Sequence, residues 1–395
     1  ISHPQKTRRK LTNADGEQIP LGIVVGAYAA ARVMASILQP IIEEEFGYET
    51  QGFDASGSEA CLRAVAGCDD PNNVEDVESR PSCFDGKTQW HVSVDNWVTG
   101  YSILWEQLVT PNPSAAPLRI NDMYMAGSGI YVTKAVWERK TMAPLLDTKE
   151  DLGLSESPAQ YFDDISTFDS MRPCEDTNLQ DTTMMAKYVE VTGDSDGVNA
   201  DGTGVCTLSS WWVAPTCRSS TSDCVPLVTG GSGWGMDGFM QKATMWQMPL
   251  AIGVADSWWS YSEIIPMQKK CLFYWWQPDT NFILLEPKRV MFPEHDATQW
   301  AIGDETTAQA WIPVETVVSH DLPNMAPLVH KFLSDFQFSF TDMETMLREQ
   351  AQTGESWDEL GCSWVTKNEE VWQQWRPTST QTGTTTATTA TATPM

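Results

Sequence analysis

Three short segments, far apart in the sequence, each combine tryptophan with glycine, proline or a small polar residue. They are DNW at Trp97, GSGWGMDG at Trp234, and FYWWQPD at Trp275 and Trp276. The face of an indole ring attracts a cation, whereas free backbone N–H groups attract an anion. A ligand with both charges, such as a betaine with a quaternary ammonium and a carboxylate, would satisfy both kinds of group. The segments therefore predict one shared binding site.

Ordinary packing is the alternative interpretation of these rings. The chain has 18 tryptophans, and a large ring in an apolar or amphipathic stretch usually serves as core or surface packing. Composition alone does not separate packing from ligand binding, so other features of the sequence have to decide.

Motifs for catalysis or metal binding give no competing function. The sequence has no HExxH and no GxxxxGK[ST]. Its five histidines are scattered, and no two cysteines have CxxC spacing, which argues against a zinc site. We therefore expect no catalytic residue, no metal and no cofactor, and the protein is not expected to be an enzyme.

Six blocks of sequence, in the same order, resemble the glycine betaine and proline betaine substrate-binding proteins of ABC transporters. They cover residues 20–375, which is most of the chain. The blocks are LGIVVGAYAAARVMASILQPIIEEEFGYETQ from Leu21, HVSVDNWVTGYSILWEQ from His91, AGSGIYVTKAVWER from Ala126, GSGWGMDG at 231–238, LFYWWQPDTNF from Leu272, and the C-terminal helical segments FLSDFQFSFTDMETMLREQ and DELGCSWVTKNEEVWQQW.

The resemblance implies an α/β fold with the two-lobed periplasmic-binding-protein (Venus-flytrap) architecture, type II, in which the chain crosses twice between lobes. Lobe 1 would consist of 18–132 and 288–376, and lobe 2 of 133–287. The alternation of apolar runs agrees with α/β sheets covered by helices. Expected strands are GIVVGAY, WHVSVDNW, GIYVTKAV, LFYWW and NFILLEP, and expected helices include ARVMASILQPIIEEE and the segment 240–265.

The resemblance also assigns the cation site. The family encloses the quaternary ammonium with tryptophans that correspond here to Trp97, Trp234 and Trp276. Trp275 precedes Trp276 in an expected strand, so its side chain should point to the opposite face.

An anion site is implied beside these rings. The backbone N–H groups of Gly235 and Met236 would bind a carboxylate, because a helix is expected to begin at Asp237 and its first N–H groups are free. Tyr101 stands where several relatives have histidine. Asp237, if it faced the site, would favour a purely cationic ligand such as choline.

Two loop-rich segments look like insertions, 54–88 in lobe 1 and 171–227 in lobe 2. Both contain cysteines among Asp, Gly, Ser and Pro residues, which bury little apolar surface and gain from disulfides. At least two disulfides are expected in these segments, and with nine cysteines one thiol would be left over, at Cys271 or Cys362. This usage favours an extracytoplasmic location: periplasmic, secreted or cell-surface.

The two ends of the chain carry no block of the resemblance. Residues 1–17 form an N-terminal extension, and 377–395 form a Thr/Ala-rich tail of the kind that stays disordered as a linker or stalk. The apolar run 21–38 follows the basic KTRRK, so a membrane span or signal segment is an alternative to the expected strand and helix.

These observations predict a solute-binding protein that captures a betaine-like or choline-like onium ligand for a membrane transporter or receptor. With 53 acidic and 25 basic residues and a formal net charge of −28, the chain is not expected to bind nucleic acid. The alternative is that the same fold serves as a structural subunit of a larger surface assembly and that its pocket is vestigial.

Overall fold

A mixed ten-stranded sheet runs through the computed structural model, which describes residues 8–73, 83, 88–132, 134–137, 158–231, 234–257, 260–261 and 269–377. The strand order is β4-β3-β5-β12-β6-β10-β8-β9-β7, and β11 pairs with β6. The strands are β3 (Leu21–Gly26), β4 (Thr50–Ala55), β5 (Val92–Asn96), β6 (Leu118–Val132), β7 (Trp211–Val213), β8 (Val225–Thr229), β9 (Leu250–Val254), β10 (Leu272–Gln277), β11 (Lys288–Arg289) and β12 (Ile312–Val318).

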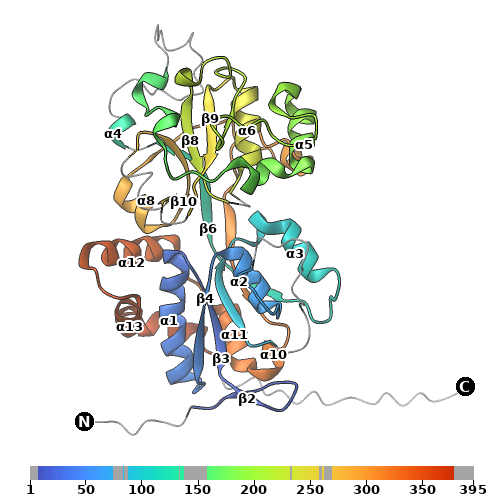
Figure 1. The fold of residues 1–395 in the computed structure, drawn as a ribbon. Coiled ribbons are helices and arrows are strands. Elements are labelled where there is room, and N and C mark those ends of the chain that lie inside the picture. Colours follow the sequence, from blue (N-terminus) through green and yellow to red (C-terminus); the bar gives the residue numbers. More distant parts are fainter. Residues whose placement is uncertain are drawn as a thin grey trace, which may run out of the picture.

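Strand β6 joins two bodies of the molecule (Figure 1). Its residues up to Ala126 pair with β12, whereas its residues from Gly127 onward pair with β10. We call the part around β3, β4, β5 and β12 the lower body and the part around β7, β8, β9 and β10 the upper body. The predicted α/β class is confirmed, and the lobe boundaries derived from the sequence stay predictions.

Helices cover both bodies, as Figure 1 shows. In the lower body, α1 has the apolar spacing of an amphipathic helix, and one face of it is buried against the sheet and against α13. The helices are α1 (Ala29–Glu45), α2 (Ser58–Val65), α3 (Ser102–Val109), α4 (Lys134–Trp137), α5 (Thr182–Thr192), α6 (Met236–Met245), α8 (Thr280–Leu285), α9 (Ala297–Ala301), α10 (Leu322–Met325), α11 (Pro327–Asp335), α12 (Phe340–Thr353), α13 (Trp357–Lys367) and α14 (Glu369–Trp372).

Gly361 sets how closely α13 approaches α1. A Cβ added at Gly361 would lie 2.3 Å from the backbone oxygen of Ser36, which neither helix can relieve by moving a side chain. Gly361→Ala is therefore expected to lower the free energy of unfolding by ~1–3 kcal/mol, as overpacking of a core does. Denaturant titration measures the change. The matched control is Gly52→Ala on exposed β4, where a Cβ meets nothing within 4 Å, and equal losses in both variants would contradict the packing argument.

Several expected elements are confirmed, and three are wrong. GIVVGAY, WHVSVDNW and LFYWW form β3, β5 and β10, and ARVMASILQPIIEEE lies in α1. The long helix expected at 240–265 instead ends at Met245, because Gln247 has a positive φ of 51° and the next apolar run forms β9. In that strand the five residues are buried between parallel and antiparallel neighbours, which periodicity alone cannot distinguish from a buried helix.

The other two corrections concern segments beside β6 and β10. NFILLEP lies mainly in helix α8, whose first turn is capped by the Asp279 carboxylate accepting the N–H of Asn281 at 2.9 Å. GIYVTKAV is strand only as far as Val132, because Lys134–Trp137 is the short helix α4.

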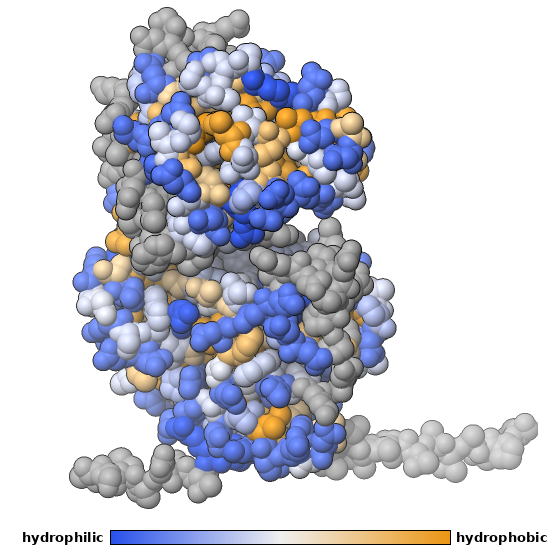
Figure 2. All heavy atoms as spheres, viewed as in Figure 1, coloured by the Kyte–Doolittle hydropathy of each residue, from blue (hydrophilic) through white to orange (hydrophobic). Residues whose placement is uncertain are grey.

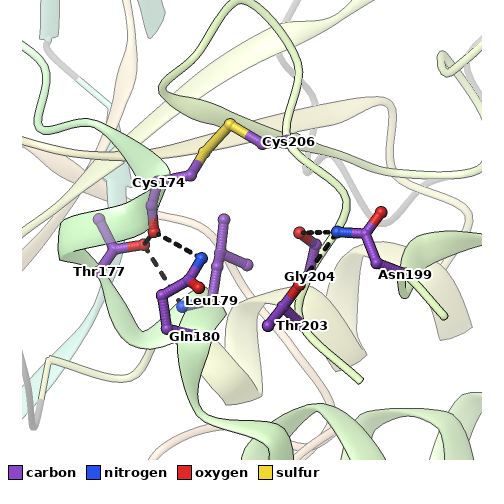
Figure 3. The surroundings of a disulfide bond; sticks show 8 residues. All are labelled: Cys174, Thr177, Leu179, Gln180, Asn199, Thr203, Gly204 and Cys206. Carbon is purple, nitrogen blue, oxygen red and sulfur yellow. Dashed lines mark hydrogen bonds between the residues drawn. A yellow bond between two sulfur atoms is a disulfide. The ribbon is translucent and has the colours of Figure 1, made fainter. Parts of the chain in front are cut away.

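Three disulfides hold the loop-rich segments, which confirms the prediction of at least two. They are Cys68–Cys83, Cys174–Cys206 and Cys217–Cys224. Figure 3 shows the second of them beside the hydrogen bonds that fold its loop, including Gln180 Nε2 to the carbonyl of Cys174 at 3.2 Å.

The prediction of one leftover thiol is wrong. None of Cys61, Cys271 and Cys362 forms a disulfide. Cys61 belongs to the loop-rich segment 54–88, yet it lies on α2 inside an apolar core, where cysteine packs as a small hydrophobe.

Part of the expected N-terminal extension is ordered. Leu11–Thr12 and Gln18–Ile19 pair as the antiparallel strands β1 and β2, and Leu11 is buried in the lower core. Residues 21–38 form a strand and a helix, and among the described residues no helix has the length and apolarity needed to cross a membrane. The tail beyond residue 377 lies outside the described residues.

Candidate functional site

Tyr28 and Trp97 follow two neighbouring strands of the lower body. Tyr28 comes after β3 and Trp97 directly after β5, and these strands are parallel, with Ile23 paired to Val92. Carboxyl ends of parallel strands meet at one edge of a sheet. Both rings are half-buried, and both pack against the lower core and against the core of the upper body that contains Trp276. They therefore lie where the two bodies meet.

The upper body presents its own rings at this meeting point. Trp234 precedes α6, and its ring centroid lies 5.1 Å from that of Trp276 on β10, at an interplanar angle of 81°. Tyr261 and Tyr274 lie 5.0 and 5.6 Å from Trp234. We call Trp234, Tyr261, Tyr274 and Trp276 the aromatic cluster. The contacts of Trp234 with Tyr261 and Trp276 are edge-to-face, which is a favourable arrangement of aromatic pairs.

Glycine lets the ring of Trp234 lie on the chain before it. A Cβ added at Gly230 would be 2.2 Å from the indole of Trp234, so only glycine fits there. Thr229 holds the same turn by donating its hydroxyl to the carbonyl oxygen of Trp234 at 2.9 Å. Gly233, the other glycine of this segment, lies outside the described residues.

Trp275 is a packing neighbour of the cluster. Although the strand pleat predicted the opposite face, its ring lies 5.2 Å from that of Trp276 and nearly parallel to it, at 6°. Its indole nitrogen donates to the Asp279 carboxylate at 3.1 Å, which ties it to the end of β10. Trp275 is fully buried, whereas Trp276 keeps 9% of its surface exposed.

A buried carboxyl lies behind Trp97 and was missed by the sequence reasoning. Asp95 accepts hydrogen bonds from the hydroxyl of Tyr124 and the indole of Trp97, and the hydroxyl of Tyr28 donates to its backbone oxygen. Burial raises the pKa of Asp95 to about 7, although both side-chain hydrogen bonds lower it. The signal was available, since Asp95 belongs to the same DNW segment as Trp97.

Tyr101 lies near the upper body as well. It ends the short 3-10 helix Val98–Tyr101 after Trp97. Burial raises the pKa of its hydroxyl, and Tyr274 of the aromatic cluster and Glu59 raise it further by charge repulsion. The hydroxyl is therefore neutral at ordinary pH, and it is a hydrogen-bond donor or acceptor rather than an ion.

The predicted anion site lies at the start of α6. The helix begins at Met236 after Gly235, whose φ is 74°, which is one residue before the expected start at Asp237. However, Asp237 lies in the first turn, and a Cβ on Gly238 would be 2.4 Å from a carboxylate oxygen of Glu305. Two of the protein's own carboxylates thus compete with any ligand carboxylate for this positive helix end.

The segment 233–238 also has the G-x-G-x-x-G spacing of dinucleotide sites. It follows β8 and its last three residues begin α6, and β8 is parallel to β9, so the β–α–β context is right for that motif. The carboxylates of Asp237 and Glu305 argue against a pyrophosphate, since a dianion would meet negative charge at the helix start.

The described residues show no metal centre. Among them, no three His, Cys, Asp or Glu side chains gather in a way that could hold an ion.

The surface between the two bodies is indented in the view of Figure 2. The predicted residues Trp97, Tyr101, Trp234 and Trp276 thus come together at the border of the two bodies, and Tyr28, Asp95, Tyr124, Tyr261 and Tyr274 join them.

No protein-family model matches the sequence, and no curated protein matches it. Among solved structures, lactococcal OpuAC in complex with glycine betaine is 12% identical and matches 91% of this chain and all of its own, with a TM-score of 0.49. The glycine betaine and L-proline binding protein ProX from Borrelia burgdorferi is 12% identical, with coverages of 90% and 96% and a TM-score of 0.48.

A choline-binding protein of an ABC transporter, in complex with choline, is 10% identical over 90% of each chain, with a TM-score of 0.48. These likenesses concern the fold alone. The structure of the chain is similar to those of glycine betaine, proline and choline binding proteins of ABC transporters.

Proposed function

We propose that the protein is an extracytoplasmic solute-binding protein that captures a quaternary ammonium or sulfonium compound between its two bodies, without altering it, for delivery to a membrane transporter. The supporting observation is that Tyr28 and Trp97 of the lower body pack against the same core as Trp276 of the upper body. A ligand held there contacts rings from both bodies, so its binding energy favours the state in which the bodies are closed.

Aromatic rings suit such a ligand because a trimethylammonium group has no N–H with which to replace its lost water contacts. Each ring contributes ~0.5–2 kcal/mol when the cation is desolvated. Micromolar affinity corresponds to about 8 kcal/mol, so three rings account for only part of it. Buried methyl surface and contacts from Tyr101 or the start of α6 would supply the remainder.

A thermal unfolding series tests this function. A ligand that binds only the folded protein stabilises it by ~2.7 kcal/mol when its free concentration is 100 times Kd. Glycine betaine, proline betaine, choline and dimethylsulfoniopropionate are the probes, and we expect at least one to raise Tm progressively with the logarithm of its concentration. X-ray scattering should show compaction with the same compound. No shift with any probe at millimolar concentration would contradict the proposal.

The second candidate is a structural subunit whose pocket is vestigial. One observation favours it: Trp234 and Trp276 touch each other directly, so part of the space between these rings is filled by the protein itself. Absence of a thermal shift together with a stable self-associated or mixed assembly in solution would favour this candidate over ligand capture.

A further inference from the structure

The Asp95 carboxyl is placed in an unusual way for a residue at the end of a strand. Its backbone has a positive φ of 62°, a conformation that non-glycine residues adopt rarely and at an energetic cost. The side chain is 1% exposed and is held by Tyr124 and Trp97. The local structure therefore keeps a carboxyl directly behind a ring of the proposed site.

The groups that bind Asp95 are neutral. Tyr124 and Trp97 donate to its side chain, and no salt bridge among the described residues includes Asp95. A buried carboxylate without a cationic partner is costly, and that cost falls when a cation arrives nearby. Trp97 donates to Asp95 and packs against the core that contains Trp276, and donating its N–H to an anion makes the indole face more attractive to a cation.

The opposite side of the site also carries negative charge. Asp237 lies in the first turn of α6 with Glu305 beside it, and Lys242 interacts with both of these carboxyl groups, with Asp304 and with Arg289. Lys242 is 1% exposed, and its ammonium donates to the backbone oxygen of Glu305. Three carboxyl groups thus share this cluster with two cations, beside the helix start where a ligand carboxylate was expected to bind.

We propose that Asp95, as a specificity-determining residue, makes this site select singly charged onium cations such as choline over zwitterionic betaines. The inference rests on the proposed function and narrows its substrate class. A singly charged cation gains attraction from the carboxylate behind Trp97. A betaine gains less from Asp95, because repulsion of its own carboxylate offsets part of the attraction of its ammonium, and Asp237 and Glu305 repel that carboxylate further.

The neighbours of Asp95 do not titrate in the range in which it does. Tyr28 precedes α1, Cys61 lies on α2 and Tyr124 on β6, and burial raises the pKa of each, that of Cys61 to about 12. Burial lowers the pKa of His91, on the same strand, to about 4. Between pH 5.5 and 8.5, Asp95 is thus the group in its own surroundings whose charge changes.

Titration calorimetry with choline and with glycine betaine, on the wild type and on Asp95→Asn, tests the proposal. The amide keeps the shape and an acceptor oxygen but removes the charge. We expect wild type to prefer choline and Asp95→Asn to lose roughly tenfold in choline affinity, or about 1.4 kcal/mol. The affinity of Asp95→Asn for glycine betaine should change much less.

The pH profile separates charge from structure. Choline affinity of the wild type should fall as pH is lowered through the titration of Asp95, because protonation removes the attracting charge. Asp95→Asn should show no such fall, which also distinguishes Asp95 from Glu305, whose pKa is likewise raised by burial to about 7. Tyr124→Phe removes a hydrogen bond that lowers the pKa of Asp95, so its midpoint should move to higher pH.

Equal losses for both ligands in Asp95→Asn, or a wild-type preference for glycine betaine that does not depend on pH, would overturn the selectivity while leaving onium binding intact. If wild type binds neither ligand, the proposed function fails as well, so the two failures are distinguishable. Should Asp95→Asn not fold, the wild-type pH profile and Tyr124→Phe still decide the matter.

Discussion

Alanine in place of Trp97, Trp234 or Trp276 is expected to weaken onium binding by ~1–3 kcal/mol in each case, through loss of cation attraction and of buried area. Trp97 comes from the lower body and the other two from the upper body, so all three losses together would show that both bodies hold the ligand. Calorimetric titration with choline or glycine betaine gives the affinities, and circular dichroism confirms that the fold is kept.

The control for this series is Trp246→Ala. Trp246 follows α6 at its far end, is 38% exposed, and donates its indole N–H to Thr306 at 2.8 Å. The variant should bind like wild type. Unchanged affinity in all three site variants, or an equal loss in the control, would remove the aromatic site, and an effect at one position alone would reduce the site to that ring.

Removal of the Cys174–Cys206 disulfide should cost more stability than removal of either other disulfide. Its cysteines are 32 residues apart, against 15 for Cys68–Cys83 and 7 for Cys217–Cys224. In the chain-entropy account, the loss for the longest loop is about 3–4 kcal/mol. Double Cys→Ser variants, compared by denaturant titration, measure the three losses.

Cys217–Cys224 is the matched control, since it lies in the same loop-rich segment and closes the shortest loop. None of the disulfides contains a residue of the proposed site, so onium affinity should persist in each variant that folds. Larger loss of stability on removing the shortest loop would contradict the loop-length argument. Loss of ligand affinity would show instead that the segment 171–227 shapes the site.

The sequence predicted the parts of the fold whose pattern has a single interpretation. The run GIVVGAY followed by an Ala-rich amphipathic segment could be assigned to β3 and α1 because strand and helix periods differ there. LAIGV and NFILL were assigned wrongly because a fully buried strand and a short capped helix look alike in hydrophobicity. Their assignment depends on Gln247 and Asp279, single residues that decide local backbone geometry.

The candidate site was predictable as far as its rings. Trp97, Trp234 and Trp276 stand out by their sequence blocks, whereas Asp95 was passed over because a carboxylate in so acidic a chain is usually solvated. Its burial depends on Tyr28 and Tyr124, which reach it from distant parts of the sequence. Contacts of that kind depend on tertiary packing and leave no local pattern.

The central claim is that the site recognises positive charge through aromatic faces of both bodies. Calorimetry of the wild type with choline and with its neutral tert-butyl analogue, in which carbon replaces nitrogen, tests this most directly, because the two ligands have nearly the same shape and apolar surface. We expect choline to bind at least roughly tenfold more tightly, about 1.4 kcal/mol, as cation attraction to desolvated rings requires. Equal affinities, or no binding of choline, would contradict the account.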